Sequence, residues 1–197
     1  MFAVALEDDL ALRLYERRDT EELYALVEAN RDHLGRWFPW TEATRGPDDT
    51  RAFIEHGLRR FAVGNGFECG IVEAGRLVGT LGLHFVTRPE GVTEIGYWLD
   101  RNAQGRGLAT RSVAGLLPHL FETMDLNRVE IRADPANDRS RAVPERLGFQ
   151  QEGVLREVGL RRGRAYDHVV YGLLRDAWRA GRDAASPAAP SPAAPRP

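Results

Sequence analysis

Hydrophobic and polar residues follow two different periods along the chain. An alternation with a period of two is typical of strands that are buried on one face. It predicts strands at residues 10–15, 67–71, 81–85, 93–99, 129–131, 154–158 and 168–174. Apolar residues three and four positions apart are typical of amphipathic helices. They predict helices beginning near residues 19 and 48, a helix over 109–120, a short helix over 139–147 and a helical turn over 171–178.

The order of these elements predicts a mixed α/β (α+β) fold. Two helices come early, a meander of three strands follows, and a glycine-rich turn with a helix leads into the last strands. Short turn sequences at 74–75 and 88–91 indicate antiparallel hairpins. Only the crossover at the glycine-rich turn requires parallel neighbours, because a parallel pair needs a long connection. We therefore expect a mostly antiparallel sheet.

The helix boundaries are predicted from capping residues. Asp19, with Glu22 three positions later, has the pattern of a capping box. Asp48 or Asp49 is expected to cap the second helix. Pro118 is expected to kink or shorten the last turn of the helix over 109–120.

Length and composition indicate one globular domain over residues 1–183. The chain has 197 residues and 43% hydrophobic content, which is enough for a substantial core. The Ala/Ser/Pro-rich segment 184–197 is expected to be disordered, because it cannot bury apolar area. No signal sequence or membrane span is recognised, which predicts a cytoplasmic protein. The net charge of -2 gives no reason to expect nucleic acid or a membrane as a partner.

All 27 basic residues other than histidine are arginines. Without lysine, the chain has no Walker A lysine, no lysine Schiff base and no Ser-x-x-Lys nucleophile. The bias itself is explained by codon usage. The single cysteine, Cys69, lies in a predicted strand and is expected to be a buried apolar residue. No metal site is expected.

The strongest chemical signal is the glycine-rich turn at 104–109, between a predicted strand and a predicted helix. Free backbone N–H groups at a helix N-terminus, together with glycines that allow close approach, suit a phosphate. The second glycine is out of register for a Rossmann fingerprint, and a P-loop needs a lysine. The remaining common ligand is the pyrophosphate of coenzyme A. An ordinary tight turn is the alternative for these six residues taken alone.

The chain resembles the GNAT superfamily of N-acetyltransferases over about residues 10–178. Gln104, Gly107 and Ala109 match its Q/R-x-x-G-x-G/A coenzyme A motif. Within the superfamily it is similar to the RimJ/RimL branch, which acetylates protein N-termini such as those of ribosomal proteins. Four further segments carry this closer resemblance: residues 36–40, 94–100, 137–149 and 167–174. The fold implied has a mixed, mostly antiparallel sheet that is splayed at the cofactor site and flanked by helices on both faces.

The resemblance implies direct transfer of an acetyl group from acetyl-CoA to a primary amine. The N–H of Leu99 is the implied oxyanion donor, and Ser140 is placed near the departing sulfur. The asparagine at 137 matches a position that contacts the pantetheine arm. Pro144 stands where many members have a tyrosine acid. The residues implied to bind the cofactor are Trp98, Leu99, Asp100, Gln104, Gly105, Arg106, Gly107, Leu108, Ala109, Thr110, Asn137 and Ser140.

The general base is expected to be Glu94, acting directly or through water, with Glu157 as the second candidate. A solvent-facing residue of a strand is the alternative for Glu94. His84 and His168 are interpreted as structural histidines.

The acceptor-binding residues are expected to be Trp37, Trp40 and Tyr97, with a satellite core as the alternative for the two tryptophans. The acceptor itself is expected to be a protein N-terminal amine. A small amine, favoured by carboxylates at 42, 48, 49 and 55, remains the alternative, and a non-catalytic acyl-CoA-binding protein is more remote. RimL-like proteins can dimerise, which makes a homodimer an expectation.

Overall fold

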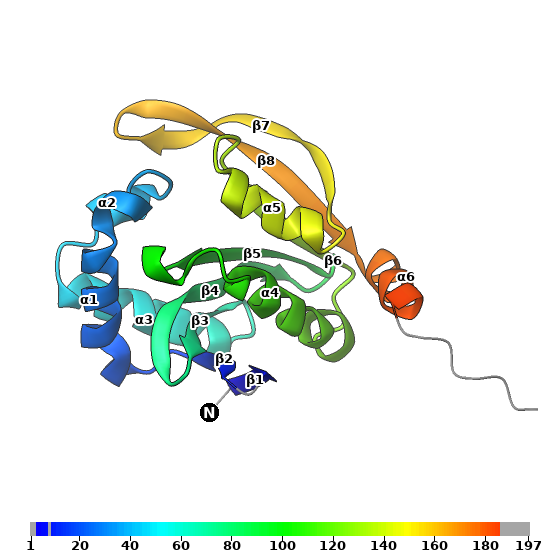
Figure 1. Cartoon of the computed structure of the whole chain (residues 1–197), viewed down its shortest axis with the longest axis horizontal. Helices are drawn as coiled ribbons and strands as arrows, with labels where there is room; N and C mark the ends of the chain where they lie inside the picture. Colours follow the sequence, from blue (N-terminus) through cyan, green and yellow to red (C-terminus); the bar gives the residue numbers. More distant parts are fainter. Residues whose placement is uncertain (1–2, 8, 186–197) are drawn as a thin grey trace, which may run out of the picture.

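A twisted sheet of eight strands lies at the centre of the computed structural model, which describes residues 3–7 and 9–185 (Figure 1). The strand order across the sheet is β1-β2-β3-β4-β5-β6-β8-β7. Only β5 and β6 pair in parallel, as expected for the connection through the glycine-rich turn. The strands are β1 (Ala3–Glu7), β2 (Leu10–Leu14), β3 (Phe67–Glu73), β4 (Arg76–Thr87), β5 (Val92–Leu99), β6 (Arg128–Ala133), β7 (Gln150–Arg161) and β8 (Arg164–Leu174).

Helices cover both faces of this sheet. On one face, the side chains of Cys69, Leu81 and Ile95 are buried in the main core together with those of α4 (Leu108–Pro118). The helix α5 (Asp138–Arg146) lies beside α4 (Figure 1). Because side chains alternate across a strand, residues such as Glu68 and Gly82 point to the opposite face. There α1 (Thr20–Ala29) and α3 (Pro47–Ala62) bury a smaller cluster, which consists of Tyr15, Leu23, Val27, Ile54 and Leu77.

The two ends of the sheet differ from the sequence predictions. The strand β1 was not predicted, and β7 and β8 extend well beyond 154–158 and 168–174. Most of β7 is exposed on both faces, so its sequence carries no alternation of buried and exposed positions. Residues 171–174 belong to β8, and the last helix, α6 (Arg175–Ala185), begins after them. The predicted helical turn over 171–178 was therefore wrong in its first half.

Two predicted caps were also wrong in detail. Asp19 precedes α1, but its carboxylate binds the guanidinium of Arg13 at 2.8 and 3.0 Å instead of the helix. The residue before α3 is Gly46, and Asp49 in the first turn accepts its N–H at 3.2 Å. In the first case the carboxylate binds outside the helix because a charged guanidinium is a stronger partner than a neutral amide. Pro118 ends α4 as predicted, and a π-helical turn (His119–Thr123) follows.

The segment 184–197, which was predicted to be disordered, overlaps the end of α6, because that helix continues to Ala185. Residues 186–197 lie outside the described part of the chain. None of the helices described combines the length and the apolar character that crossing a bilayer requires.

Candidate active site

The sheet opens between β5 and β6. Their parallel pairing ends at Ile95 and Ile131, whereas β5 continues to pair with β4 as far as Leu99 and Gly79. The N–H of Asp100 donates to the carbonyl of Val78 at 2.8 Å. Leu99 and Gly79 are therefore a non-hydrogen-bonded pair of the β4–β5 ladder, and the N–H of Leu99 points away from β4. This N–H group faces the gap between β5 and β6, which no longer pair beyond Ile95 and Ile131.

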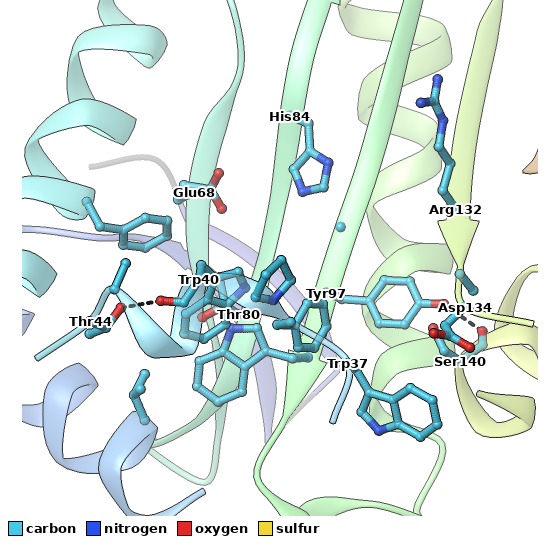
Figure 2. Close-up of a pocket in the computed structure, with 18 of the residues that line it drawn as sticks. Trp37, Trp40, Thr44, Glu68, Thr80, His84, Tyr97, Arg132, Asp134 and Ser140 are labelled. Carbon is cyan, nitrogen blue, oxygen red and sulfur yellow. Dashed lines mark hydrogen bonds between the residues drawn. The ribbon is translucent and has the colours of Figure 1, made fainter. Parts of the chain in front are cut away.

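Two hollows meet at this gap. A groove of about 990 Å³ runs past the N-terminus of α4, and an inner cavity of about 570 Å³ lies on the face of the sheet that α1 and α3 cover (Figure 2). We use the names groove and inner cavity for these two from here on. The residues that line both are Trp37, Phe38, Tyr97, Trp98, Asn137 and Ser140. A molecule in the groove can therefore reach one in the inner cavity.

The glycine-rich turn forms one end of the groove. Gly105 and Gly107 have φ angles of 80° and 74°, in the left-handed region, and a Cβ added to either would meet nothing within 4 Å. The first helical bond of α4 runs from the N–H of Arg111 to the carbonyl of Gly107 at 2.9 Å. The amides at 108–110 therefore have no acceptor within the helix. Such a turn offers an anion both free donors and open space.

Not every residue expected at the turn lies in the groove. Gln104, Gly105, Leu108, Ala109 and Thr110 line it together with Gly107. The side chain of Arg106 instead forms an ion pair with Glu73, at 2.8 Å between Nη2 and Oε2. Asp100 accepts the N–H of Asn102 at 3.2 Å and is not among the lining residues.

Positive charge reaches the groove from elsewhere in the chain. The lining arginines are Arg36, Arg111, Arg139 and Arg146. Arg139 also donates to Oε1 of Gln104 at 2.9 Å, and His33 lies 2.7 Å from the amide nitrogen of the same glutamine. Sequence reasoning missed these residues, because they come from three separate segments and the chain is rich in arginine everywhere.

Asn137 and Ser140 lie at the N-terminus of α5, where groove and inner cavity meet. The amide oxygen of Asn137 accepts the N–H of Ser140 at 3.2 Å, so this residue is also the N-cap of the helix. The hydroxyl of Tyr97 donates to the carbonyl of Ser140 at 2.8 Å. Burial raises the pKa of Tyr97, so that the phenol stays protonated near neutral pH. Pro144 is buried within α5 and supplies no hydroxyl.

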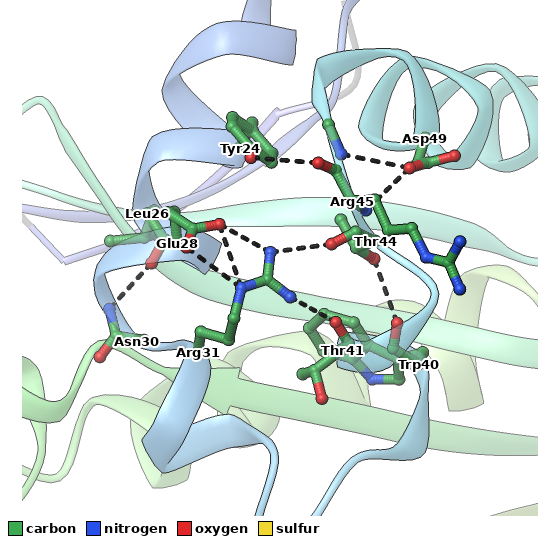
Figure 3. A network of polar contacts seen from close by, with 11 residues as sticks. Tyr24, Leu26, Glu28, Asn30, Arg31, Trp40, Thr41, Thr44, Arg45 and Asp49 are labelled. Atoms are coloured by element: carbon green, nitrogen blue, oxygen red, sulfur yellow. Dashed lines mark hydrogen bonds and ion pairs between the residues drawn. The ribbon is translucent and has the colours of Figure 1, made fainter.

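Aromatic side chains cover the inner cavity. Trp37 and Trp40 come from the segment 35–46, which we call the lid, and both line the cavity. The ring of Trp40 lies 6.2 Å from that of Trp98 and 5.7 Å from that of Phe38. Arg31 fixes the far side of the lid by donating to the carbonyls of Thr41 and Thr44 (Figure 3). The expected acceptor residues are thus brought together around one space.

A group of charged side chains forms the polar wall of this cavity. Glu94 is 9% exposed, and its Oε1 lies 2.8 Å from Nδ1 of His84. Its Oε2 lies 3.0 Å from Nε of Arg132. Burial raises the pKa of Glu94, but the hydrogen bond from His84 and the positive charges of His84 and Arg132 outweigh it. The net result is a pKa below the ordinary value of a glutamate.

The structure does not bring Glu157 to this site. It is exposed in an irregular part of β7, with a φ of 51°, and its N–H donates to Asp167 at 2.8 Å. It lines neither the groove nor the inner cavity.

The carboxylates expected near the lid are mostly directed elsewhere. Asp48 pairs with Arg51 at 2.9 Å, Glu55 pairs with Arg17 at 2.9 Å, and Glu42 lies 3.7 Å from Arg162. Of the four, only Asp49 lines the inner cavity.

Sequence reasoning missed two other acidic residues of the cavity, Glu68 and Asp134. Burial raises the pKa of Glu68 to about 7, against the opposing charges of His84 and Arg60. The one sequence signal for Glu68 was the glycine inside strand β4. Gly82 pairs with Glu68 on the neighbouring strand, and a Cβ at this position would overlap the carboxylate.

Comparisons with known proteins agree with this geometry. The family model of the acetyltransferase (GNAT) domain matches residues 9–150. YdaF of Bacillus subtilis (strain 168), provisionally assigned as a ribosomal N-acetyltransferase, is 36% identical over 179 residues, which cover 90% of this chain and 98% of YdaF. The ribosomal-protein-serine acetyltransferase of Escherichia coli (strain K12) is 26% identical, over 84% of this chain and 92% of that protein.

Solved structures show the same fold. A crystal structure of a probable acetyltransferase is 36% identical, with a TM-score of 0.86 over 90% of this chain and 99% of that one. RimJ of Mycobacterium smegmatis, in complex with a CoA-disulfide, is 26% identical with a TM-score of 0.81, over 89% of each chain. The family model spans most of the chain, and the opened sheet with its glycine turn is the arrangement expected for it. The chain therefore belongs to the GNAT acetyltransferases and is an N-acetyltransferase of the RimJ/RimL-like type.

Proposed function

We propose that this enzyme transfers the acetyl group of acetyl-CoA to the α-amine of a protein N-terminus. The observation that carries the proposal is the meeting of the groove and the inner cavity beside the gap between β5 and β6. A thioester that enters from the groove and an amine that enters from the cavity would meet there. Holding two reactants in such a geometry is a large part of catalysis.

The groove suits the donor. The free amides of the glycine-rich turn and the lining arginines would hold the pyrophosphate of acetyl-CoA. The exposed edge of β5 offers main-chain groups that a pantetheine amide can pair with, as a further strand would. In this pose the N–H of Leu99 donates to the thioester oxygen, and that bond strengthens as the oxygen gains negative charge.

Two protons leave the acceptor nitrogen during the reaction, and one proton reaches the sulfur. The acceptor ammonium loses a proton to a base, and the free amine nitrogen forms a bond to the thioester carbon. The carbon–sulfur bond then breaks and leaves the electron pair on sulfur. The nitrogen releases its second proton as the amide forms, and the thiolate takes up one proton. Ser140, which lines both hollows, is proposed to pass this second proton from nitrogen to sulfur through its hydroxyl, in place of the absent tyrosine.

The lining of the inner cavity supports a peptide acceptor. Flat aromatic side chains from the lid and from Trp98 can grip an extended peptide without a fixed side-chain sequence. Two relatives are named for acetylating the serine of a ribosomal protein and the alanine of ribosomal protein uS5. By analogy, the acceptor proposed here is a ribosomal protein.

One observation favours a small cationic amine instead. The buried carboxyl of Glu68 lies in the wall of the inner cavity, only partly neutralised by Arg60 at 3.3 Å. A second ammonium group on the acceptor would pair with it.

Thiol release from acetyl-CoA distinguishes these acceptors. We expect release with peptides that begin with a free serine or alanine, and none with the same peptides carrying a blocked N-terminus. Mass spectrometry of the product should place the acetyl group on the first nitrogen. Faster turnover of spermidine or of free amino acids than of every peptide would contradict the protein acceptor and favour the small amine.

A further inference from the structure

His84 is held against the floor of the inner cavity in one orientation. Its Nδ1 atom lies 2.8 Å from Oε1 of Glu94 on the neighbouring strand. The opposite edge of the ring, with Nε2, lies over Gly96, where an added Cβ would overlap Nε2. Half of the side chain is exposed (53%), and the residue lines the cavity (Figure 2). One ring nitrogen is therefore fixed by a carboxylate, and the other has no hydrogen-bond partner among the described residues.

Glu94, in contrast to His84, has no polar side-chain atom without a partner. Its two oxygens face His84 and Arg132, and its pKa lies below the ordinary value. A carboxylate engaged on both oxygens has little capacity to accept a proton from an incoming amine. Glu94 is instead suited to orient the imidazole. An ionised carboxylate accepts the Nδ1–H of a neutral histidine, and the lone pair of the ring is then on Nε2.

We propose that His84 is the general base of the acetyl transfer, with Glu94 as the positioning residue that fixes its tautomer. The inference rests on the proposed function, and it revises the expectation that Glu94 is the base and His84 a structural residue. In the reaction, Nε2 takes one proton from the acceptor ammonium, which leaves a neutral amine with its lone pair free for the thioester carbon. His84 then returns that proton to solvent as the product leaves.

The position of Gly96 supports this assignment. It follows Ile95, the last residue of β5 that pairs with β6, and it precedes Tyr97, which lines both hollows. Nε2 of His84 therefore lies at the point where the sheet opens. A glycine inside a strand weakens it, unless another group approaches closely there. Here the close group is the imidazole.

Several charged groups around His84 shift its pKa. The hydrogen bond to Glu94 raises its pKa above the ordinary value, against the opposing effect of burial. Two further charged groups face it: Glu68 on β3 raises the pKa and Arg60 on α3 lowers it. Arg132 on β6 acts through its pairing with Glu94. A higher pKa makes the free lone pair of Nε2 more basic toward the acceptor ammonium.

The first test compares His84→Gln with wild type over pH 6–10, with His56→Gln as the matched control. His56 is exposed on α3 and lines neither hollow. We expect His84→Gln to lower kcat/KM about 100-fold at pH 7, the usual effect of losing a general base. The deficit should shrink above about pH 8, where α-amines lose their proton unaided. An equal deficit at every pH would indicate a structural role and overturn the proposal.

The second test does not depend on activity. Nitrogen-15 NMR of the histidines should show neutral His84 with its proton on Nδ1, and Glu94→Gln should lower the pKa of His84 while leaving acetyl-CoA affinity unchanged. Neutral His84 with its proton on Nε2 would overturn the proposal, even in an enzyme whose acceptor is unknown. If the wild-type enzyme acetylates no amine but its His84 carries the proton on Nδ1, the proposed function is contradicted, whereas the role of Glu94 in fixing the tautomer of His84 is supported.

Discussion

Nη2 of Arg161, near the tip of the β7–β8 hairpin, lies 2.7 Å from Oδ2 of Asp134 at the end of β6. The same guanidinium donates from Nη1 to the carbonyl of Trp37 at 3.1 Å. It also lies over the rings of Trp37 and Tyr166, at 6.0 and 5.1 Å from their centres. One arginine thus joins the hairpin, the lid and the wall of the inner cavity.

Arg161→Ala is expected to weaken acceptor binding, because Trp37 loses the group that holds it over the cavity. We expect the KM for the acceptor to rise about tenfold, roughly the effect of one hydrogen bond to a charged group. The matched control is Arg164→Ala, since Arg164 is exposed on the same hairpin and lines neither the groove nor the inner cavity. Equal values of KM in the two variants would show that Arg161 does not support the lid.

Gly107→Val is expected to abolish acetyl-CoA binding measured by calorimetry. A branched side chain would fill the open space at the turn and block the approach of a phosphate to the amides of α4. Gly75→Val is the matched control, because Gly75 also has a positive φ, of 78°, and open space around it, in the β3–β4 turn. It carries the same backbone strain away from the groove. Unchanged affinity in Gly107→Val would refute the assignment of the turn.

Gly96→Ala is expected to reduce the rate of acetyl transfer, because the new methyl group would displace the His84 ring. The loss should approach that of His84→Gln, while acetyl-CoA affinity is retained. Gly153→Ala, on the exposed strand β7 where nothing lies within 4 Å of an added Cβ, is the control and should keep full activity. A fully active Gly96→Ala would mean that the position of the ring is unimportant.

Glu68 should make the folded state less stable as the pH rises. Its pKa of about 7 in the folded protein lies above the ordinary value of 4.5, mainly because of burial. The folded state therefore holds the proton more tightly than the unfolded state does, and this stabilisation, complete below pH 4.5, is lost by pH 7. Relative to wild type, Glu68→Gln should gain up to about 3 kcal/mol in the free energy of unfolding between pH 5 and pH 8. Urea unfolding at both pH values measures it, and a constant difference would contradict the prediction.

Much of the fold follows from local sequence patterns. The meander β3–β4–β5, the crossover through α4 and the short helix α5 were predicted, because each has strong periodicity bounded by glycine or proline. The strand β7 was predicted at less than half its length, since nearly all of its residues are exposed. Asp19 is the N-cap residue of α1 as predicted, but it makes no side-chain capping bond, because Arg13, six residues earlier, binds its carboxylate.

In the candidate site, too, local features were predicted from the sequence, whereas contacts between distant residues were not. The turn around Gly107, which lines the groove, was located from the sequence because it consists of consecutive residues; that it binds a phosphate is a proposal. The relation between His84 and Glu94 was not, although both residues were noted. They are ten residues apart on different strands, and only the register of β4 against β5 brings Nδ1 to the carboxylate.

The sequence by itself determined the family, the order of most elements and the position of the glycine-rich turn, since these depend on local spacing. Only the tertiary structure decided which charged side chains face the inner cavity and which form ion pairs elsewhere. Arg106 and Glu157 turn away from the site, whereas Glu68 and His84 enter it. The physical reason is that the pKa and the available lone pairs of a side chain depend on burial and on partners that are distant in the sequence.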